Sequence, residues 1–156
     1  MIRQATLSDI WRLLEILQEA HSRSIYADVC GIDRERAKGL LSEGIAASFN
    51  GQAFAAVAEQ AGQVEGFILG SEEPLYLIGD KTVVTDLFWV ATSRVDARDP
   101  RQLMAGLISW GRLRPNAAEI RCGTTPVIQE PEKAARMLNR LGFEPYGTFH
   151  RMEIKR

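Results

Sequence analysis

The segment from Lys81 to Trp110 reads KTVVTDLFWVATSRVDARDPRQLMAGLISW, and it decides how the rest of the 156-residue chain is interpreted. Its first third is dense in β-branched and aromatic residues, namely Val83, Val84, Leu87, Phe88, Trp89 and Val90. Such a run predicts a strand in the middle of a sheet, buried on both faces. Asp99 and Pro100 then suit the N-cap and the first position of a helix. The apolar residues that follow at helical spacing predict its inner face: Leu103, Met104, Leu107, Ile108 and Trp110.

Three arginines, Arg94, Arg98 and Arg101, lie at this junction between strand and helix. A helix N-terminus exposes backbone amides and carries a partial positive charge, so it favours anions. The combination predicts a site for a phosphate-bearing ligand. The alternative interpretation is that these are solvated loop arginines that serve solubility.

Composition limits the classes of protein that the chain can belong to. Hydrophobic residues make up 46% and charged residues 25% of the sequence, as in an ordinary globular protein, and the length predicts a single domain over residues 1–156. No apolar run approaches the ~20 residues that span a bilayer, and the N-terminus lacks the apolar core of a signal peptide, so we expect a cytoplasmic protein. A net charge of −1 disfavours nucleic-acid binding. Cys30 and Cys122 have no metal-ligand spacing, so we expect reduced thiols and no metal site.

The remaining elements are predicted from period and cap residues. A strand at Ile2 to Ala5 precedes a helix that Thr6 and Asp9 can cap and that runs to about Ser22. The expected inner face of this helix is Leu7, Ile10, Trp11, Leu14 and Leu17. A second helix, from Asp33 to about Ala47, should bury Ala37, Leu40, Leu41 and Ile45.

The second half of the chain adds strands and one more helix. Phe54 to Glu59 and Val64 to Leu69 should form an antiparallel hairpin. Further elements are a strand at Ala118 to Thr124, a loop from Thr125 to Glu130, a helix from about Pro131 to Leu141 ended by Gly142, and two strand segments around Gly147. The order predicts an α+β fold with a mixed sheet.

This order and three local sequences resemble the GNAT superfamily of acyl-CoA-dependent N-acetyltransferases. The three are IRQATLSDIWRLLEIL, TDLFWV with the loop and helix after it, and AARMLNRLGFEPYG, whose LGF turn is the most specific. The likeness covers essentially the whole chain and implies a mixed, mostly antiparallel central sheet flanked by helices. The arginine-rich loop looks like acetyltransferase-like proteins of phages and prophages.

The resemblance also implies which residues meet acetyl-CoA, the expected co-substrate. In the family, acetyl-CoA lies where the fourth and fifth strands splay apart. Phe88, Trp89 and Val90 would offer backbone groups to the pantetheine arm, and the amide of Trp89 or Val90 would polarise the thioester carbonyl. The phosphates would meet the segment from Val95 to Met104, with the side chains of Arg94, Arg98 and Arg101 and with Gln102 and Leu103.

The acceptor side of the family's site maps onto the segment after the first helix. His21 and Tyr26 lie there in this sequence and could contact the amine acceptor; the alternative for His21 is an ordinary surface histidine.

The sequence departs from the family at two places. The two glycines expected in the phosphate loop fall on Arg98 and Pro100, and a proline has no amide to donate. The tyrosine that protonates the departing thiolate in many members falls on Leu138, and an asparagine earlier in that helix falls on Pro131. Tyr76, Tyr146, Cys122 and Thr124 are candidate replacements for the acid.

Asp86 is the candidate general base, because it is the only carboxylate inside an otherwise apolar strand. Burial would raise its pKa towards a useful range; the alternative is a structural aspartate bonded to the backbone or to Thr85. The expected reaction is acetyl transfer from acetyl-CoA to a primary amine of a small molecule or protein. The alternative is a catalytically degenerate GNAT-like module that binds a phage or host protein. Family members often pair, which makes a homodimer a further expectation.

Overall fold

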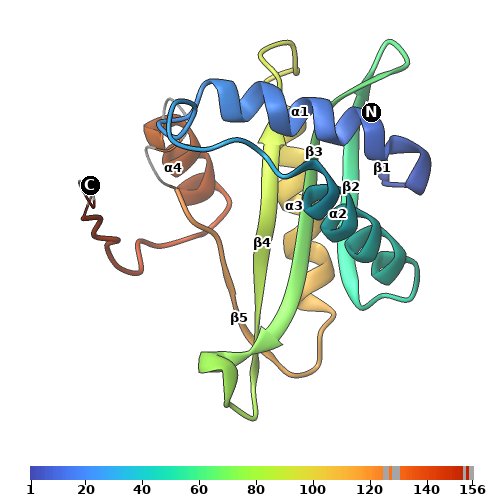
Figure 1. The fold of residues 1–156 in the computed structure, drawn as a ribbon. Coiled ribbons are helices and arrows are strands. Elements are labelled where there is room, and N and C mark those ends of the chain that lie inside the picture. The colour runs from blue at the N-terminus through green and yellow to red at the C-terminus, as the bar shows by residue number, and fades with distance from the viewer. Residues whose placement is uncertain (125–126, 128–130, 153, 155–156) are drawn as a thin grey trace.

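A computed structural model describes residues 1–124, 127, 131–152 and 154. In this part of the chain five strands form one sheet in the order β1-β2-β3-β4-β5 (Figure 1). Neighbouring strands are antiparallel except β4 and β5, which are parallel. The strands are β1 (Ile2–Gln4), β2 (Ala53–Gln60), β3 (Gln63–Pro74), β4 (Thr82–Ala91) and β5 (Ala117–Arg121). The helices are α1 (Ile10–Ser22), α2 (Arg34–Phe49), α3 (Asp99–Arg112) and α4 (Pro131–Arg140), with short 3-10 turns η1 (Leu7–Asp9) and η2 (Leu75–Leu77).

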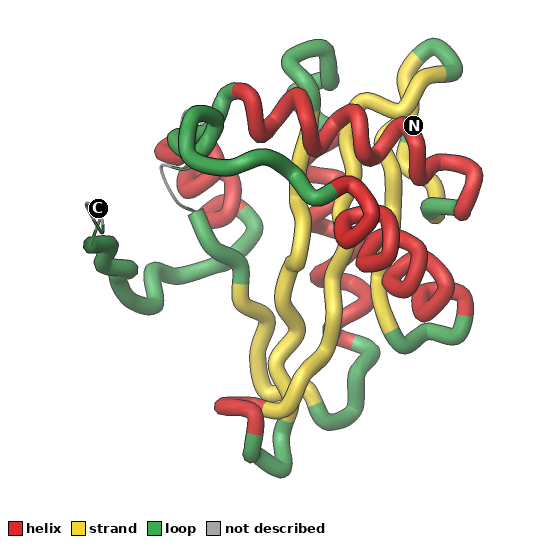
Figure 2. Tube along the Cα trace, in the orientation of Figure 1, coloured by secondary structure: helices red, strands yellow, loops and turns green. Residues whose placement is uncertain are grey.

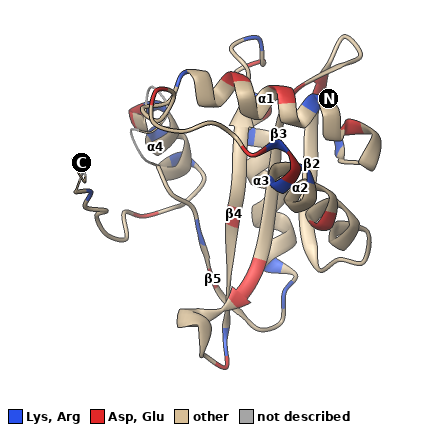
Figure 3. Ribbon diagram, viewed as in Figure 1, with Lys and Arg blue, Asp and Glu red and all other residues tan. Residues whose placement is uncertain are grey.

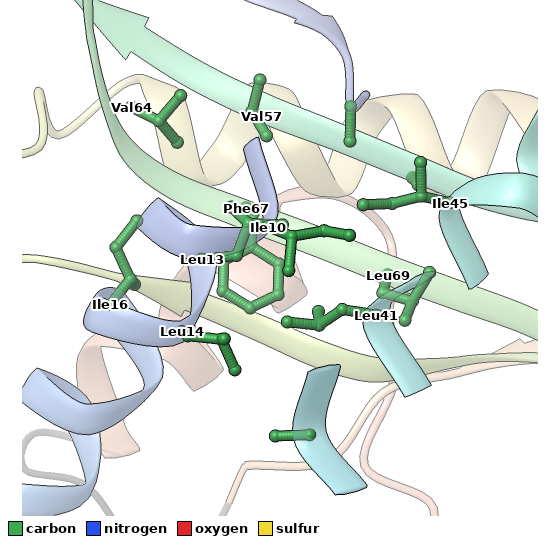
Figure 4. Close-up of a cluster of buried hydrophobic side chains, with 13 residues drawn as sticks. Ile10, Leu13, Leu14, Ile16, Leu41, Ile45, Val57, Val64, Phe67 and Leu69 are labelled. Carbon is green, nitrogen blue, oxygen red and sulfur yellow. The ribbon is translucent and has the colours of Figure 1, made fainter. Parts of the chain in front are cut away.

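Helices cover both faces of the sheet (Figures 1 and 2). Helices α1 and α2 pack on one face around Phe67, Leu13 and Leu41, in the apolar cluster of Figure 4. Helices α3 and α4 contribute Leu103, Leu107 and Leu138 to a second cluster on the other face. The α+β fold with a mixed, mostly antiparallel sheet is therefore confirmed.

The inner faces of α1 and α2 differ from the predicted stripes. Leu7 is 56% and Trp11 61% exposed, because Leu7 belongs to the 3-10 turn that precedes α1 and the helical period starts after it. The buried residues of α1 are Ile10, Leu13, Leu14, Ile16 and Ala20. In α2, Leu40 was also wrongly placed in the core and is 45% exposed.

Strand β4 lies fourth in the sheet, and β3 occupies its middle. Val83 and Val84 are buried as predicted, but burial on both faces is wrong for the second half of the strand. Leu69 pairs with Phe88 and Gly70 with Asp86, so Leu87 is a bulged residue, and its side chain is 53% exposed. This bulge bends β4 at the point where it leaves β5.

The start of α3 is shifted by one residue from the prediction. The N-cap position is held by Arg98, and Asp99 is the first helical residue. Asp99 is buried, and its carboxylate accepts a hydrogen bond of 2.9 Å from the Gln60 side chain. The aspartate therefore anchors the helix to the end of β2.

The C-terminal segment differs from the two predicted strands. Gly142 ends α4 with φ of 94°, as expected of an αL cap. The described residues after it, 143–152 and 154, form no strand, and Figure 2 draws this segment as loop. Pro145 cannot donate to a ladder, and Gly147 favours irregular backbone, which together weaken strand pairing here. The predicted loop from Thr125 to Glu130 lies outside the described residues except for Val127.

Candidate functional site

Strands β4 and β5 separate part of the way along the sheet. Their pairing runs from Thr82 with Ala117 to Thr85 with Arg121, and β5 ends there. Strand β4 continues to Ala91 and is paired only with β3 over that length. In Figure 1 the chain after β5 leaves β4 and runs towards α4. The second half of β4 thus has one edge without a strand partner in the described residues.

A cavity of about 970 Å³ adjoins this open edge. Its volume is at the upper end of the range for small-molecule sites, which run to roughly 1,000 Å³. Its walls come from the end of β4, the start of α3, the residues after β5, and α4. The apolar lining includes Trp89, Val90, Val95 and Met137, and the basic lining residues are Arg23, Arg98, Arg101, Lys133, Arg136 and Arg140. No acidic side chain is found among the described lining residues.

The backbone of β4 directs specific groups towards the opening. The Thr92 amide donates to the Glu65 carbonyl on the β3 side at 2.8 Å. Because successive residues of a strand direct their backbone groups to opposite edges, Val90 faces β3 whereas Trp89 and Ala91 face the open edge. The Ala91 carbonyl follows this alternation, since it accepts from the Arg23 guanidinium at 3.1 Å. The Trp89 amide therefore points into the opening.

Asp86 and Cys122 mark the apex of the opening, one residue beyond the last β4–β5 pair. Burial raises the pKa of Asp86 above its usual value, and this effect outweighs the hydrogen bonds with the Cys122 thiol and the Gly123 backbone that lower it. Burial, and secondarily the Asp86 charge, raise the pKa of Cys122, so its thiolate is disfavoured. Asp86 is not itself a lining residue of the large cavity, whereas Gly123 is.

The loop between β4 and α3 uses many of its amides internally. The Arg94 and Val95 amides donate to Thr92, and the Arg98 and Asp99 amides donate to Asp96. Pro100 has no amide. Four amides of this segment are therefore already used and Pro100 offers none, so it presents fewer backbone donors to an anion than a glycine-rich phosphate loop does.

Arg94 is engaged away from the cavity. Its guanidinium bonds the buried Glu65 carboxylate at 3.1 and 3.2 Å and contacts Glu19 at 3.3 Å. Burial raises the pKa of Glu65, but the bonds from Arg94 and Thr92 outweigh it and leave the pKa below its usual range. Arg12 completes this network with a 3.1 Å bond to the same carboxylate.

The structure separates the remaining candidates for cofactor binding. Trp89, Val90, Arg98 and Arg101 line the cavity together. The Trp89 indole also donates to the Pro100 carbonyl at 3.2 Å, which ties β4 to the start of α3. The others lie elsewhere. Phe88 packs in the α1–α2 cluster, Leu103 is fully buried in the α3 cluster, and Gln102 lines a smaller neighbouring hollow of about 390 Å³.

The two candidate acceptor residues lie beside the cavity without lining it. The His21 ring is 2.7 Å from the Cys30 carbonyl, which fixes it against its own loop. The Tyr26 ring lies 5.5 Å from the Arg151 guanidinium of the C-terminal segment. Their neighbours Ala20 and Arg23 do reach the cavity wall.

Sequence reasoning missed the contribution of α4. Lys133, Arg136 and Arg140 lie three and four residues apart, which places them on one helix face, and all three line the cavity. That spacing was readable in the sequence. Leu138 is buried in the core and is not among the described lining residues of the cavity. Over the described residues, no group of His, Cys, Asp and Glu could hold a metal ion.

Comparisons with known proteins agree with this architecture. No family model matches the sequence, and no curated protein matches it significantly. Among solved structures, AAC(6')-Iy in complex with the bisubstrate analogue CoA-S-monomethyl-acetylneamine matches with a TM-score of 0.70 and 20% identity over 99% of this chain and 98% of that one.

Two further structures show the same likeness. The ribosomal-protein-alanine N-acetyltransferase of Brucella melitensis has a TM-score of 0.69 and 24% identity over 94% of this chain and 86% of its own. A transcriptional regulator from Bacillus halodurans C-125 has a TM-score of 0.63 and 21% identity over 99% of both chains. At these identities the comparisons show the fold, which is that of the GNAT acyl-CoA N-acyltransferases. Within the described residues, no helix is long and apolar enough to cross a membrane.

Proposed function

We propose that this protein binds acetyl-CoA along the open edge of β4 and transfers the acetyl group to a primary amine of a small molecule or protein. The observation that carries the proposal is the cavity itself: within the described residues it adjoins a strand edge without a partner, and the charged residues that line it are all basic. A CoA thioester needs both features, since its pantetheine arm carries amides and its other end carries phosphates.

The two ends of the co-substrate meet different groups. The outward-facing Trp89 amide can donate to the pantetheine arm or to the thioester carbonyl, and the alternation along β4 favours it over Val90. Arg98 and Arg101 hold the phosphates through their side chains, because the loop amides are largely engaged within the loop. The phosphate loop of this chain is thus a divergent one.

Asp86 acts as general base for the amine. Its raised pKa keeps it closer to the pH at which a base is most effective. Since it lies at the apex and outside the lining of the large cavity, it takes the amine proton through a water molecule. The amine nitrogen then attacks the thioester carbonyl, the carbon–sulfur bond breaks, and CoA leaves as a thiolate. The developing oxyanion is stabilised by the Trp89 amide.

The acid that protonates the thiolate is not a phenol of the described cavity wall, where no tyrosine is found. Thr124 is the hydroxyl-bearing residue among the described lining residues and is a candidate, whereas solvent can also protonate a thiolate directly. On the acceptor side, His21 and Tyr26 stay candidates next to the wall formed by Ala20 and Arg23.

The second candidate function is a degenerate module that binds without acetyl transfer, in a phage particle or on a host protein. The observation that favours it is the core position of Leu138, where many family members carry the catalytic tyrosine. A cytoplasmic location and a homodimer are compatible with both functions.

Detection of released CoA thiol, with acetyl-CoA and a panel of amines, distinguishes the two. The panel holds aminoglycosides, amino sugars, polyamines and peptides with free N-termini. Thiol release that depends on one class of amine, with mass-spectrometric detection of the N-acetyl product, supports the enzyme. Binding of acetyl-CoA with no product from any class favours the module.

A further inference from the structure

Helix α4 presents a row of basic side chains to the cavity, which residues at the start of α3 also line. Lys133, Arg136 and Arg140 are the basic residues of this face, and Figure 3 colours the basic residues of the helix blue. The cavity therefore receives positive charge from two helices that are far apart in the sequence.

Four of these cations form no ion pair in the described part of the chain. The side chains of Arg98, Arg101, Arg136 and Arg140 make no hydrogen bond or ion pair there, and no described acidic residue lines the cavity with them, although Arg98 also borders the smaller hollow that contains Asp96 and Asp99. Some arginines elsewhere in the chain are paired, such as Arg3 with Asp9 at 2.8 Å and Arg114 with Glu72 at 2.7 Å. Like charges that gather around one hollow repel each other, so a folded protein gains from an anion that binds between them.

The loop before α3 leaves room for basic side chains of α4 to take part in phosphate binding. The amides of Arg94, Val95, Arg98 and Asp99 are used inside the loop, and Pro100 has none. A diphosphate bound at the start of α3 would meet fewer backbone donors than in a glycine-rich loop, and side chains can supply the missing ones. Arginine suits this replacement, because its planar guanidinium can bond two phosphate oxygens at once.

We propose that Arg136 and Arg140 of α4 form the second half of a phosphate clamp, whose first half is Arg98 and Arg101 at the start of α3. The clamp holds the phosphates of CoA from two sides, and it rests on the proposed acetyl-CoA binding. Phosphate recognition in this chain then depends on guanidinium groups of two helices, in place of a run of backbone amides.

Calorimetric titration of acetyl-CoA tests the clamp. Arg136→Gln and Arg140→Gln should each raise Kd for acetyl-CoA by roughly tenfold. This is the lower end of the range expected for the loss of a hydrogen bond to a charged group, because both arginine side chains are exposed. Arg112→Gln is the matched control: it removes one exposed arginine from the far end of α3, outside the cavity lining, and should leave Kd unchanged.

Salt dependence separates a phosphate contact from a structural role. The wild-type affinity should fall as sodium chloride rises, and the double variant Arg136→Gln/Arg140→Gln should lose much of that dependence. Arginine and glutamine have similar helix propensities, so the melting temperature of each variant is expected to stay near that of the wild type. Arg136→Lys keeps the positive charge but loses the planar guanidinium that can bond two phosphate oxygens, so this variant should bind acetyl-CoA with intermediate affinity.

Unchanged Kd and an unchanged salt slope in the double variant, with wild-type protein that does bind acetyl-CoA, would overturn the clamp and leave the proposed function standing. If the wild type does not bind acetyl-CoA, the proposed function fails, and inorganic pyrophosphate becomes the probe. Pyrophosphate binding that both α4 substitutions weaken would then support the clamp alone, and its absence would overturn both.

Discussion

Asp86→Asn is the substitution that most sharply tests the chemistry at the apex of the opening. Asparagine keeps the size of the side chain and its ability to accept a hydrogen bond, but it cannot take a proton from the amine. A positioned general base contributes roughly 10²–10⁴-fold to a rate. Asp86 works through water from outside the cavity lining, so we expect the lower end, a loss of about 10²-fold in kcat/KM, which corresponds to about 2.7 kcal/mol of transition-state stabilisation.

The pH dependence of kcat/KM provides a second test of Asp86 as the general base. A base works only when it is ionised, so wild-type kcat/KM should rise with pH through the pKa of Asp86, which burial has raised above its ordinary value. The Asn variant should lack this rising limb and keep only the limb that belongs to the acceptor amine. The assay is the initial rate of thiol release at saturating acetyl-CoA and varied acceptor concentration across the pH range, with the exposed Asp80→Asn as control.

Stability distinguishes a catalytic from a structural Asp86. Its pKa is higher in the folded than in the unfolded chain, so the stability it contributes is present at low pH and is lost as the pH rises from about 3.9 through the folded value. At neutral pH, Asp86→Asn should therefore melt at or above the wild-type temperature. A variant that melts lower and keeps full activity would refute the reasoning and identify Asp86 as a structural residue.

Four further predictions concern the scaffold. Thr92→Val removes the 2.6 Å hydrogen bond to the buried Glu65 carboxylate and should lower the free energy of unfolding by about 2 kcal/mol in urea titration; an unchanged midpoint would count against a role for this network. Because hydrogen bonds from Arg94 and Thr92 outweigh the burial of Glu65 and lower its pKa, its contribution to stability should be present above about pH 4.3 and be lost as the pH falls through its folded pKa. Gly70→Ala would place a Cβ 2.3 Å from Leu107 and 3.2 Å from the Thr85 carbonyl, and should cost about 1–3 kcal/mol, whereas Gly39→Ala meets nothing within 4 Å and should stabilise α2; equal effects of the two would contradict this packing. Leu138→Tyr should lower the melting temperature without raising turnover, because position 138 lies in the core and not on the cavity wall; a gain in turnover would show that the side chain can reach the cavity.

The spacing of apolar residues and the positions of cap residues were sufficient to predict most of the fold. The apolar spacing of α3 predicted the buried Leu103, Met104, Leu107 and Ile108, whereas Trp110 is only half-buried. Asp33 caps α2 through the Arg36 amide at 3.0 Å, where the sequence placed the start of that helix. The two wrong positions in α1, Leu7 and Trp11, share one cause. A 3-10 turn between the cap and the helix changes the period, and no residue type announces that turn.

The site was less accessible to sequence reasoning, because it depends on where strands stop pairing. The sequence TDLFWV does not indicate that β5 ends beside Thr85. That end point determines which backbone groups of β4 have no strand partner and face the cavity. Arg94 and Arg98 occupy similar positions in the sequence. Of these two, only Arg94 forms hydrogen bonds with the buried Glu65. Glu65 belongs to a strand that pairs with β4, so its partner could not be identified from spacing along the chain.

Calorimetric titration of the wild-type protein with acetyl-CoA tests the central claim most directly. The cavity beside β4 predicts a single site that saturates below millimolar ligand, with binding weakened by salt and by substitution of Arg98 or Arg101. Dephosphorylated pantetheine thioesters, which lack the charged end, should bind much more weakly. Absence of heat up to millimolar acetyl-CoA would contradict the account and leave only the binding module.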